Sequence, residues 1–215
     1  MEEVGKSASE QKVLYAFGDS LIAGHTYPRS FVDFAADRNG FQLQKFAING
    51  ATVMEIPSIG GRVIEQVANA PEKAPDLVIF DGGTNDAEYL GRYQNEFAVF
   101  EKDFQQLLFL LKKRWPHAEL IYLQPHKMGS REMTIQERLQ QFTKEICEKN
   151  DIRLLDLFSG GQMDTREFAA KNAYTFDSND QLGLPGKNGS GTHPNLAAIE
   201  EFYLPALQEL LAEPN

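Results

Sequence analysis

The stretch VLYAFGDSL at residues 13–21 joins five apolar residues to a short polar turn. A continuous apolar run of this length predicts a strand that is buried on both faces of a sheet. Gly18, Asp19 and Ser20 are turn-forming residues, so we expect the chain to turn sharply where the strand ends. The stretch therefore predicts a buried strand that delivers polar side chains to one edge of a sheet.

Other segments of the chain repeat this pattern. Apolar runs at 77–80 (LVIF), 120–123 (LIYL) and 152–155 (IRLL) predict three more buried strands, and 41–48 is a weaker fifth candidate with partial alternation. Apolar residues spaced three and four apart predict the intervening helices, which we place at 28–39, 63–69, 97–111, 135–146 and 195–211. Strands that alternate with helices predict an α/β domain with a doubly wound parallel sheet.

Length and charge narrow the class of protein. The 215 residues suit one domain, which we place at 13–215 after a polar tail at 1–12. With 31 acidic and 21 basic side chains the net charge is −10, which disfavours nucleic acid and anionic membrane surfaces as partners. The tail lacks the apolar stretch of a secretory signal, so we expect a cytoplasmic protein.

The residue types that bind metals and cofactors are sparse. Cys147 is the single cysteine of the sequence, and we expect it to be a small buried residue on a helix. His25, His117 and His126 have no ligand-type residues at metal spacing, so no metal site is predicted. His25 lies one or two turns past Ser20, and we expect it to be an exposed helix residue, with a place beside the substrate pocket as the alternative. No Gly-x-Gly-x-x-Gly motif occurs, and we expect no cofactor.

Polar residues follow the predicted strands, where ligands bind in open α/β sheets. Ser20 follows the first strand, Gly50 the second and Asn85 the third, while His193 ends an irregular glycine-rich stretch at 174–192. A serine hydroxyl becomes a nucleophile when a base such as histidine takes its proton. Backbone N–H groups of a serine and a glycine, with an asparagine amide, are suited to stabilise the oxyanion that then forms. The residues thus favour acyl transfer.

Four blocks of the sequence together resemble the SGNH hydrolases, also called GDSL-type esterases or lipases. The blocks are FGDSL at 17–21, NG at 49–50, GTND at 83–86 and GTHPN at 191–195, and the resemblance spans residues 13–210. It implies a flavodoxin-like three-layer α/β/α sandwich with a five-stranded parallel sheet. It also implies that Ser20 is the nucleophile, that Ser20, Gly50 and Asn85 form the oxyanion hole, and that His193 is the base.

The last block departs from the family pattern. The family has an aspartate three residues before the histidine, and this chain has Ser190 there. Three explanations remain open. The Ser190 hydroxyl or a backbone carbonyl orients His193 in a dyad, or Asp177 or Asp180 supplies the acid, or activity is weak or lost.

The sequence therefore predicts a serine esterase that hydrolyses carboxylic esters, with short acyl or O-acetyl groups, through an acyl-enzyme on Ser20. The alternative is a catalytically weak or inactive binding protein on the same fold, because of Ser190. The expected partner is a small-molecule ester, and the oligomeric state cannot be read from the sequence.

Overall fold

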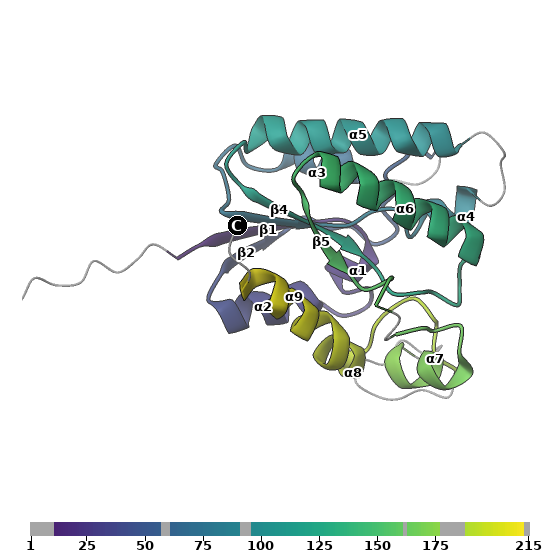
Figure 1. The fold of residues 1–215 in the computed structure, drawn as a ribbon. Helices are drawn as coiled ribbons and strands as arrows, with labels where there is room; N and C mark the ends of the chain where they lie inside the picture. Colours follow the sequence, from purple (N-terminus) through teal and green to yellow (C-terminus); the bar gives the residue numbers. More distant parts are fainter. Residues whose placement is uncertain (1–10, 57–60, 91–95, 161–162, 177–187, 213–215) are drawn as a thin grey trace, which may run out of the picture.

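A five-stranded parallel sheet forms the centre of the molecule (Figure 1). The structure is a computed structural model that describes residues 11–56, 61–90, 96–160, 163–176 and 188–212. The strand order is β2-β1-β3-β4-β5, and every neighbouring pair is parallel. The strands are β1 (Val13–Phe17), β2 (Gln42–Lys45), β3 (Leu77–Phe80), β4 (Glu119–Gln124) and β5 (Arg153–Asp156). The prediction of a five-stranded parallel sheet is confirmed.

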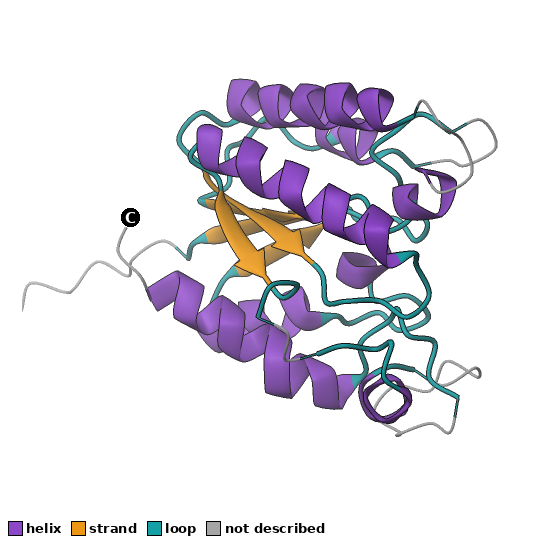
Figure 2. Cartoon of the chain, turned by 45° about the vertical axis from the view of Figure 1, so that its right-hand side comes forward, coloured by secondary structure: helices purple, strands orange, loops and turns teal. Residues whose placement is uncertain are grey.

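Helices cover both faces of the sheet, which gives three layers (Figure 2). One face carries α3 (Val63–Asn69), α4 (Asp86–Leu90), α5 (Phe97–Arg114) and α6 (Met133–Lys149). The other face carries α1 (Ser20–Ala23), α2 (Phe31–Asn39) and the C-terminal segments α8 (Leu196–Ala198), η1 (Ile199–Tyr203) and α9 (Leu204–Ala212). The helix α7 (Phe168–Tyr174) lies beside α8 (Figure 1).

The strand side chains explain this layering. In β1, Tyr15 and Phe17 pack into the core under α3 and α5, whereas Leu14 and Ala16 pack into the core under α2 and α9. Successive side chains of a strand point to opposite faces, so a fully apolar strand fills two cores at once. The buried thiol of Cys147 on α6 belongs to the first core, which confirms its predicted place.

The predicted C-terminal helix is not regular. We expected one helix over 195–211, but η1 is a π-helical turn between α8 and α9. Pro205 has no N–H to donate to the carbonyl four residues earlier, and its ring clashes with that carbonyl. A widened turn just before the proline relieves both problems. The short helices α1, α4 and α7 were not predicted.

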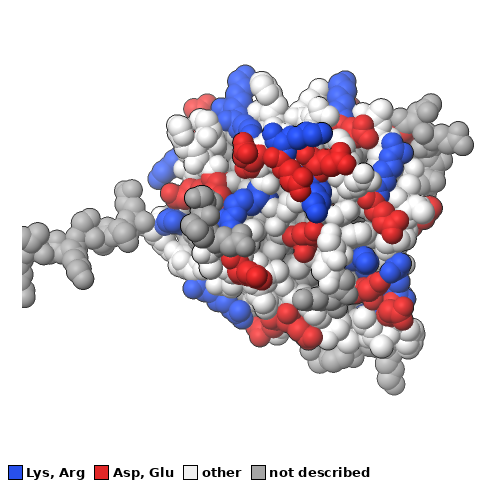
Figure 3. Space-filling view, in the orientation of Figure 1, with Lys and Arg blue, Asp and Glu red and all other residues white. Residues whose placement is uncertain are grey.

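Charged side chains of both signs are interspersed on the face of the molecule shown in Figure 3. None of the helices in the described residues is long and apolar enough to cross a lipid bilayer. Of the predicted tail at 1–12, residues 1–10 lie outside the described residues.

Candidate active site

Ser20 begins α1 directly after the end of β1. The Asp19 carboxylate caps this helix by accepting a hydrogen bond of 2.9 Å from the Leu21 N–H. Gly18 has a φ of +148°, and a Cβ there would lie 1.7 Å from Asp81 Oδ1. Only glycine lets the backbone pass at this point, so the Gly-Asp-Ser sequence fixes the position of the serine.

His193 is held by a short antiparallel bridge. The Phe176 N–H donates to the His193 carbonyl at 3.0 Å, and the Ser190 N–H donates to the Phe176 carbonyl at 2.6 Å. Two residues further on, the Asn195 side chain caps α8 by accepting from the Ala198 N–H at 3.1 Å. The backbone on both sides of His193 is therefore fixed.

The structure brings Ser20 and His193 together. Ser20 Oγ lies 2.9 Å from His193 Nε2, although the residues are 173 positions apart. Burial, followed by the positive charges of His25, Arg131 and His126, lowers the pKa of His193 to about 3. The imidazole is therefore neutral at pH 7, and its Nε2 can accept the hydroxyl proton of Ser20.

The predicted oxyanion donors differ in whether their N–H groups already have a hydrogen-bond acceptor. Within the described residues, neither the Ser20 N–H nor the Gly50 N–H has a hydrogen-bond partner. Gly50 adopts a φ of +80° in the turn after β2. The Asn85 amide nitrogen, by contrast, donates to the Ala51 carbonyl at 2.9 Å and to Asp19 Oδ2 at 3.1 Å. Asn85 would therefore have to release one of these bonds to reach an oxyanion.

Of the three candidates for orienting His193, Ser190 alone lies within the described residues, and its hydroxyl binds the backbone rather than the ring. Ser190 Oγ accepts hydrogen bonds from the backbone N–H groups of Thr192 at 3.3 Å and His193 at 3.2 Å. Asp177 and Asp180 lie outside the described residues. Across the described part of the chain, no carboxylate forms a hydrogen bond to His193.

His25 is the clearest residue that the sequence interpretation missed. We expected an exposed helix position, but α1 ends at Ala23 and His25 follows the Gly24 cap in a left-handed conformation with φ +56°. Its ring is partly buried and stacks on the ring of His193, with centroids 3.8 Å apart and planes 7° apart. No local pattern signals this contact, because it joins the two ends of the chain.

Two other residues near the site also follow predicted strands, but the sequence interpretation did not single them out. Asp81 follows β3 directly and accepts from the Asp19 N–H at 2.7 Å. Arg131 lies in the loop after β4 and donates from Nε to the Thr84 carbonyl at 2.9 Å. The strand-end rule that found Ser20 also applies to these two positions.

The acid that follows Asn85 has a structural role. Asp86 is fully buried, and its carboxylate accepts from the Val53 N–H at 3.0 Å and the Met54 N–H at 2.8 Å. Within the described residues, no group of three or more histidine, cysteine, aspartate or glutamate side chains is placed to hold a metal ion.

Residues 16–198 match the GDSL-like lipase/acylhydrolase family. The chain belongs to this family. A GDSL-like acylhydrolase is a hydrolase of esters, so membership settles the general class of the protein. Among curated proteins, no sequence matches this chain significantly.

Solved structures share the fold of this GDSL-like hydrolase. A protein from Lactobacillus plantarum is 19% identical with a TM-score of 0.74, and the match covers 94% of this chain and 96% of that one. A lipolytic G-D-S-L family protein from Veillonella parvula is 14% identical with a TM-score of 0.66, covering 94% and 100%. A phospholipase A1 from Streptomyces albidoflavus is 15% identical with a TM-score of 0.66, covering 93% and 99%. At these identities the likeness supports the α/β fold.

Proposed function

We propose that this protein is a serine esterase that hydrolyses carboxylic esters with short acyl or O-acetyl groups. The observation that carries the proposal is the 2.9 Å contact between Ser20 Oγ and His193 Nε2. A hydroxyl at hydrogen-bond distance from a neutral imidazole is the arrangement that activates a serine nucleophile. The substrate is a small-molecule ester.

In the first half of the reaction, Ser20 Oγ attacks the ester carbonyl while its proton moves to His193 Nε2. The new Oγ–C bond gives a tetrahedral intermediate with a negative oxygen. The N–H groups of Ser20 and Gly50 supply the donors for this oxygen, and one such donor is worth about 10²–10³ in rate. The C–O bond then breaks, and His193 returns the proton to the leaving alcohol.

In the second half, water replaces the alcohol. His193 takes a proton from this water as it attacks the acyl-enzyme, and the acid product leaves as Ser20 regains its proton. The positive charge that His193 carries during each half lies in a partly buried place near Arg131. This charge is costly there, so we expect a lower rate than a triad with an orienting carboxylate would give.

The proposed limit to short acyl groups is tested separately from the catalytic residues. The apolar cavity lined by Gly83, Met128, Leu139 and Phe158, among others, has neither Ser20 nor His193 in its lining, so it does not set the length of the acyl group. A panel of p-nitrophenyl acetate, butyrate, octanoate and laurate tests this size limit, and faster hydrolysis of laurate than of acetate would contradict it.

The catalytic proposal is tested with a fluorophosphonate probe and p-nitrophenyl acetate. We expect a mass adduct on Ser20 and ester turnover in the native chain. We expect Ser20→Ala to abolish the adduct and to lower kcat/KM by at least about 10³, because the residual rate comes from binding and the oxyanion donors alone. His193→Ala is expected to slow labelling by a similar factor.

Ser159→Ala is the matched control, because Ser159 is an exposed serine outside the site. It should label and turn over as the native chain does. A native chain that gives neither adduct nor turnover would overturn the esterase and favour the binding protein.

A further inference from the structure

The stacked rings of His25 and His193 form a contact that the proposed reaction does not use. The two imidazoles are nearly parallel at 7° with centroids 3.8 Å apart, which is full face-to-face contact. Phe176 lies beside both rings, with its centroid 6.1 Å from each. Rotation of the His193 ring about its Cβ–Cγ bond would break this stack. The contact therefore fixes the plane of the ring and, with it, the direction in which Nε2 faces Ser20.

We propose that His25 is the positioning residue of His193, and that its stacked ring does the orienting work for which Ser190 supplies no carboxylate. This inference rests on the proposed esterase function. Ser190 Oγ binds backbone N–H groups, and within the described residues the hydrogen bond of the His193 ring goes to Ser20. Of the described ring contacts of His193, the stack on His25 is the closer, at 3.8 Å between centroids against 6.1 Å for Phe176, and it therefore constrains the ring most tightly.

The backbone of His25 is held firmly enough for this role. A left-handed conformation is unfavourable for a non-glycine residue, so surrounding contacts must enforce it. The Asn49 side chain donates to the His25 carbonyl at 2.8 Å, and the Tyr27 N–H donates to the Gly24 carbonyl at 2.9 Å. These bonds fix the turn on both sides of the residue.

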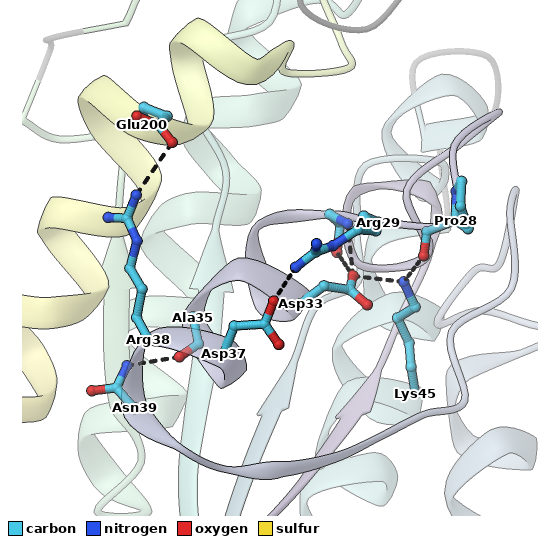
Figure 4. A network of polar contacts seen from close by, with 10 residues as sticks. Pro28, Arg29, Asp33, Ala35, Asp37, Arg38, Asn39, Lys45 and Glu200 are labelled. Atoms are coloured by element: carbon cyan, nitrogen blue, oxygen red, sulfur yellow. Dashed lines mark hydrogen bonds and ion pairs between the residues drawn. The ribbon is translucent and has the colours of Figure 1, made fainter.

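A lysine on β2 ties this turn to the sheet. Lys45 Nζ donates to the Ala23 carbonyl at 3.0 Å and to the Pro28 carbonyl at 2.8 Å, and it pairs with the Asp33 carboxylate at 2.7 Å. Figure 4 shows this ammonium group converging with Pro28 and Asp33 next to α2. The segment that carries His25 is therefore anchored at both of its ends by one partly buried cation.

Positioning by a ring and positioning by a carboxylate have opposite electrostatic results. A carboxylate beside His193 would stabilise the imidazolium and raise the pKa, whereas a second imidazole adds no negative charge. The charged groups that act on His193 are His25, Arg131 and His126, and each lowers its pKa. The two modes are therefore distinguishable by titration as well as by rate.

The experiment compares His25→Phe, which keeps a flat ring, with His25→Ala, which removes it. We expect His25→Phe to retain kcat/KM within about threefold, and His25→Ala to lower it by about 10²-fold, the usual loss for a misplaced catalytic group. Ser190→Asp should raise kcat/KM by a larger factor in the His25→Ala background than in the native chain. His117→Ala, at an exposed histidine, is the matched control and should change nothing.

Carbon-13 NMR of the histidine rings provides a readout that needs no turnover. We expect the titration of His193 to move to higher pH in both His25 variants, because each removes a positive neighbour. An unchanged titration in His25→Ala would overturn the contact even if the native chain proved to have no esterase activity. Equal gains from Ser190→Asp in both backgrounds, or full activity in His25→Ala, would overturn the positioning role while leaving the esterase intact.

Discussion

In the proposed reaction, the ring of His193 must be neutral to accept a proton from Ser20 and must then carry that proton briefly. Burial and its cationic neighbours favour the neutral form and lower its pKa to about 3. A base with a lowered pKa stays neutral to lower pH, but it is also a weaker base. The lowered pKa therefore weakens the driving force for proton transfer to His193, and it also keeps the base in the correct protonation state near neutral pH.

The pH dependence of labelling follows from this pKa. We expect the rate of fluorophosphonate labelling at Ser20 to stay flat from pH 8 down to about pH 4.5, because His193 protonates only near its pKa of about 3. A histidine with the ordinary pKa of about 6.5 would lose about nine-tenths of its rate by pH 5.5. Intact-mass measurement of labelling against time, with circular dichroism to confirm folding, decides between them.

Ser190→Asp supplies the control for this profile. The new carboxylate stabilises the imidazolium, so the acid limb of the labelling profile should move to higher pH. Ser190→Ala removes the hydroxyl without adding charge and should leave the limb in place. If Ser190→Asp left the limb unmoved, residue 190 would not act on the ring at all.

Individual site residues differ in how far the sequence predicts them. Ser20, Gly50 and Asn85 follow predicted strands, and the parallel sheet places all three at one edge, so local pattern suffices. His25 was misplaced because its role depends on a ring that comes from the far end of the chain. The hydrogen bonds that occupy the Asn85 amide could not be predicted either, because its acceptors, the Asp19 side chain and the Ala51 carbonyl, lie far from it in the sequence.

Among the elements, continuous apolar runs were predicted best. The strands β1 and β3 occupy the predicted residues 13–17 and 77–80, because their side chains are buried on both faces. The edge strand β2 is shorter than the predicted run at 41–48, and none of its residues is fully buried, so its apolar pattern marks its ends poorly. The short helices α1 and α4 escaped prediction because four or five residues cannot display a helical period.

The Asp86 carboxylate connects α4 to the loop after β2 through hydrogen bonds to two backbone N–H groups. We expect Asp86→Ala to lower the free energy of unfolding by about 2–4 kcal/mol, because the buried N–H groups of Val53 and Met54 would lose their acceptor. Urea denaturation measures this loss. Asp86→Asn keeps one side-chain oxygen and should cost less, and an equal loss in both variants would show that charge, not hydrogen bonding, matters here.

Across the whole molecule, three buried carboxyl groups make stability depend on pH. Burial raises the pKa of Asp19 and of Asp86 to about 6, and it raises the pKa of Asp81 well above its usual value. Asp81 Oδ2 is buried, and none of the described residues forms a hydrogen bond to it. A carboxyl group whose pKa is raised in the folded state loses its proton at a lower pH in the unfolded state. The free energy of unfolding therefore falls as pH rises from about 4 through 6 and beyond.

Removing one of these charges should stabilise the folded chain at high pH. We expect Asp81→Asn to raise the free energy of unfolding at pH 8 by about 1–3 kcal/mol and to change it little at pH 4, where the native carboxyl is already protonated. The amide keeps an oxygen for the Asp19 N–H. Thermal unfolding at the two pH values measures the difference.

Asp151→Asn makes the same chemical change at an exposed residue and should have a small effect at both pH values. A stability gain for Asp81→Asn that is equal at pH 4 and pH 8 would contradict the ionisation account.

The 173 positions that separate Ser20 from His193 have a consequence for the protein as it is made. At a synthesis rate of about 5–20 residues per second, the proposed nucleophile is added to the chain roughly 9–35 s before its proposed base. During that interval a growing chain holds the hydroxyl without the imidazole, and any copy cut short upstream of residue 193 is inert. In the proposed reaction, hydrolysis would begin only after all five strands of the sheet have been translated. Reactivity with the probe would then mark the completion of the chain.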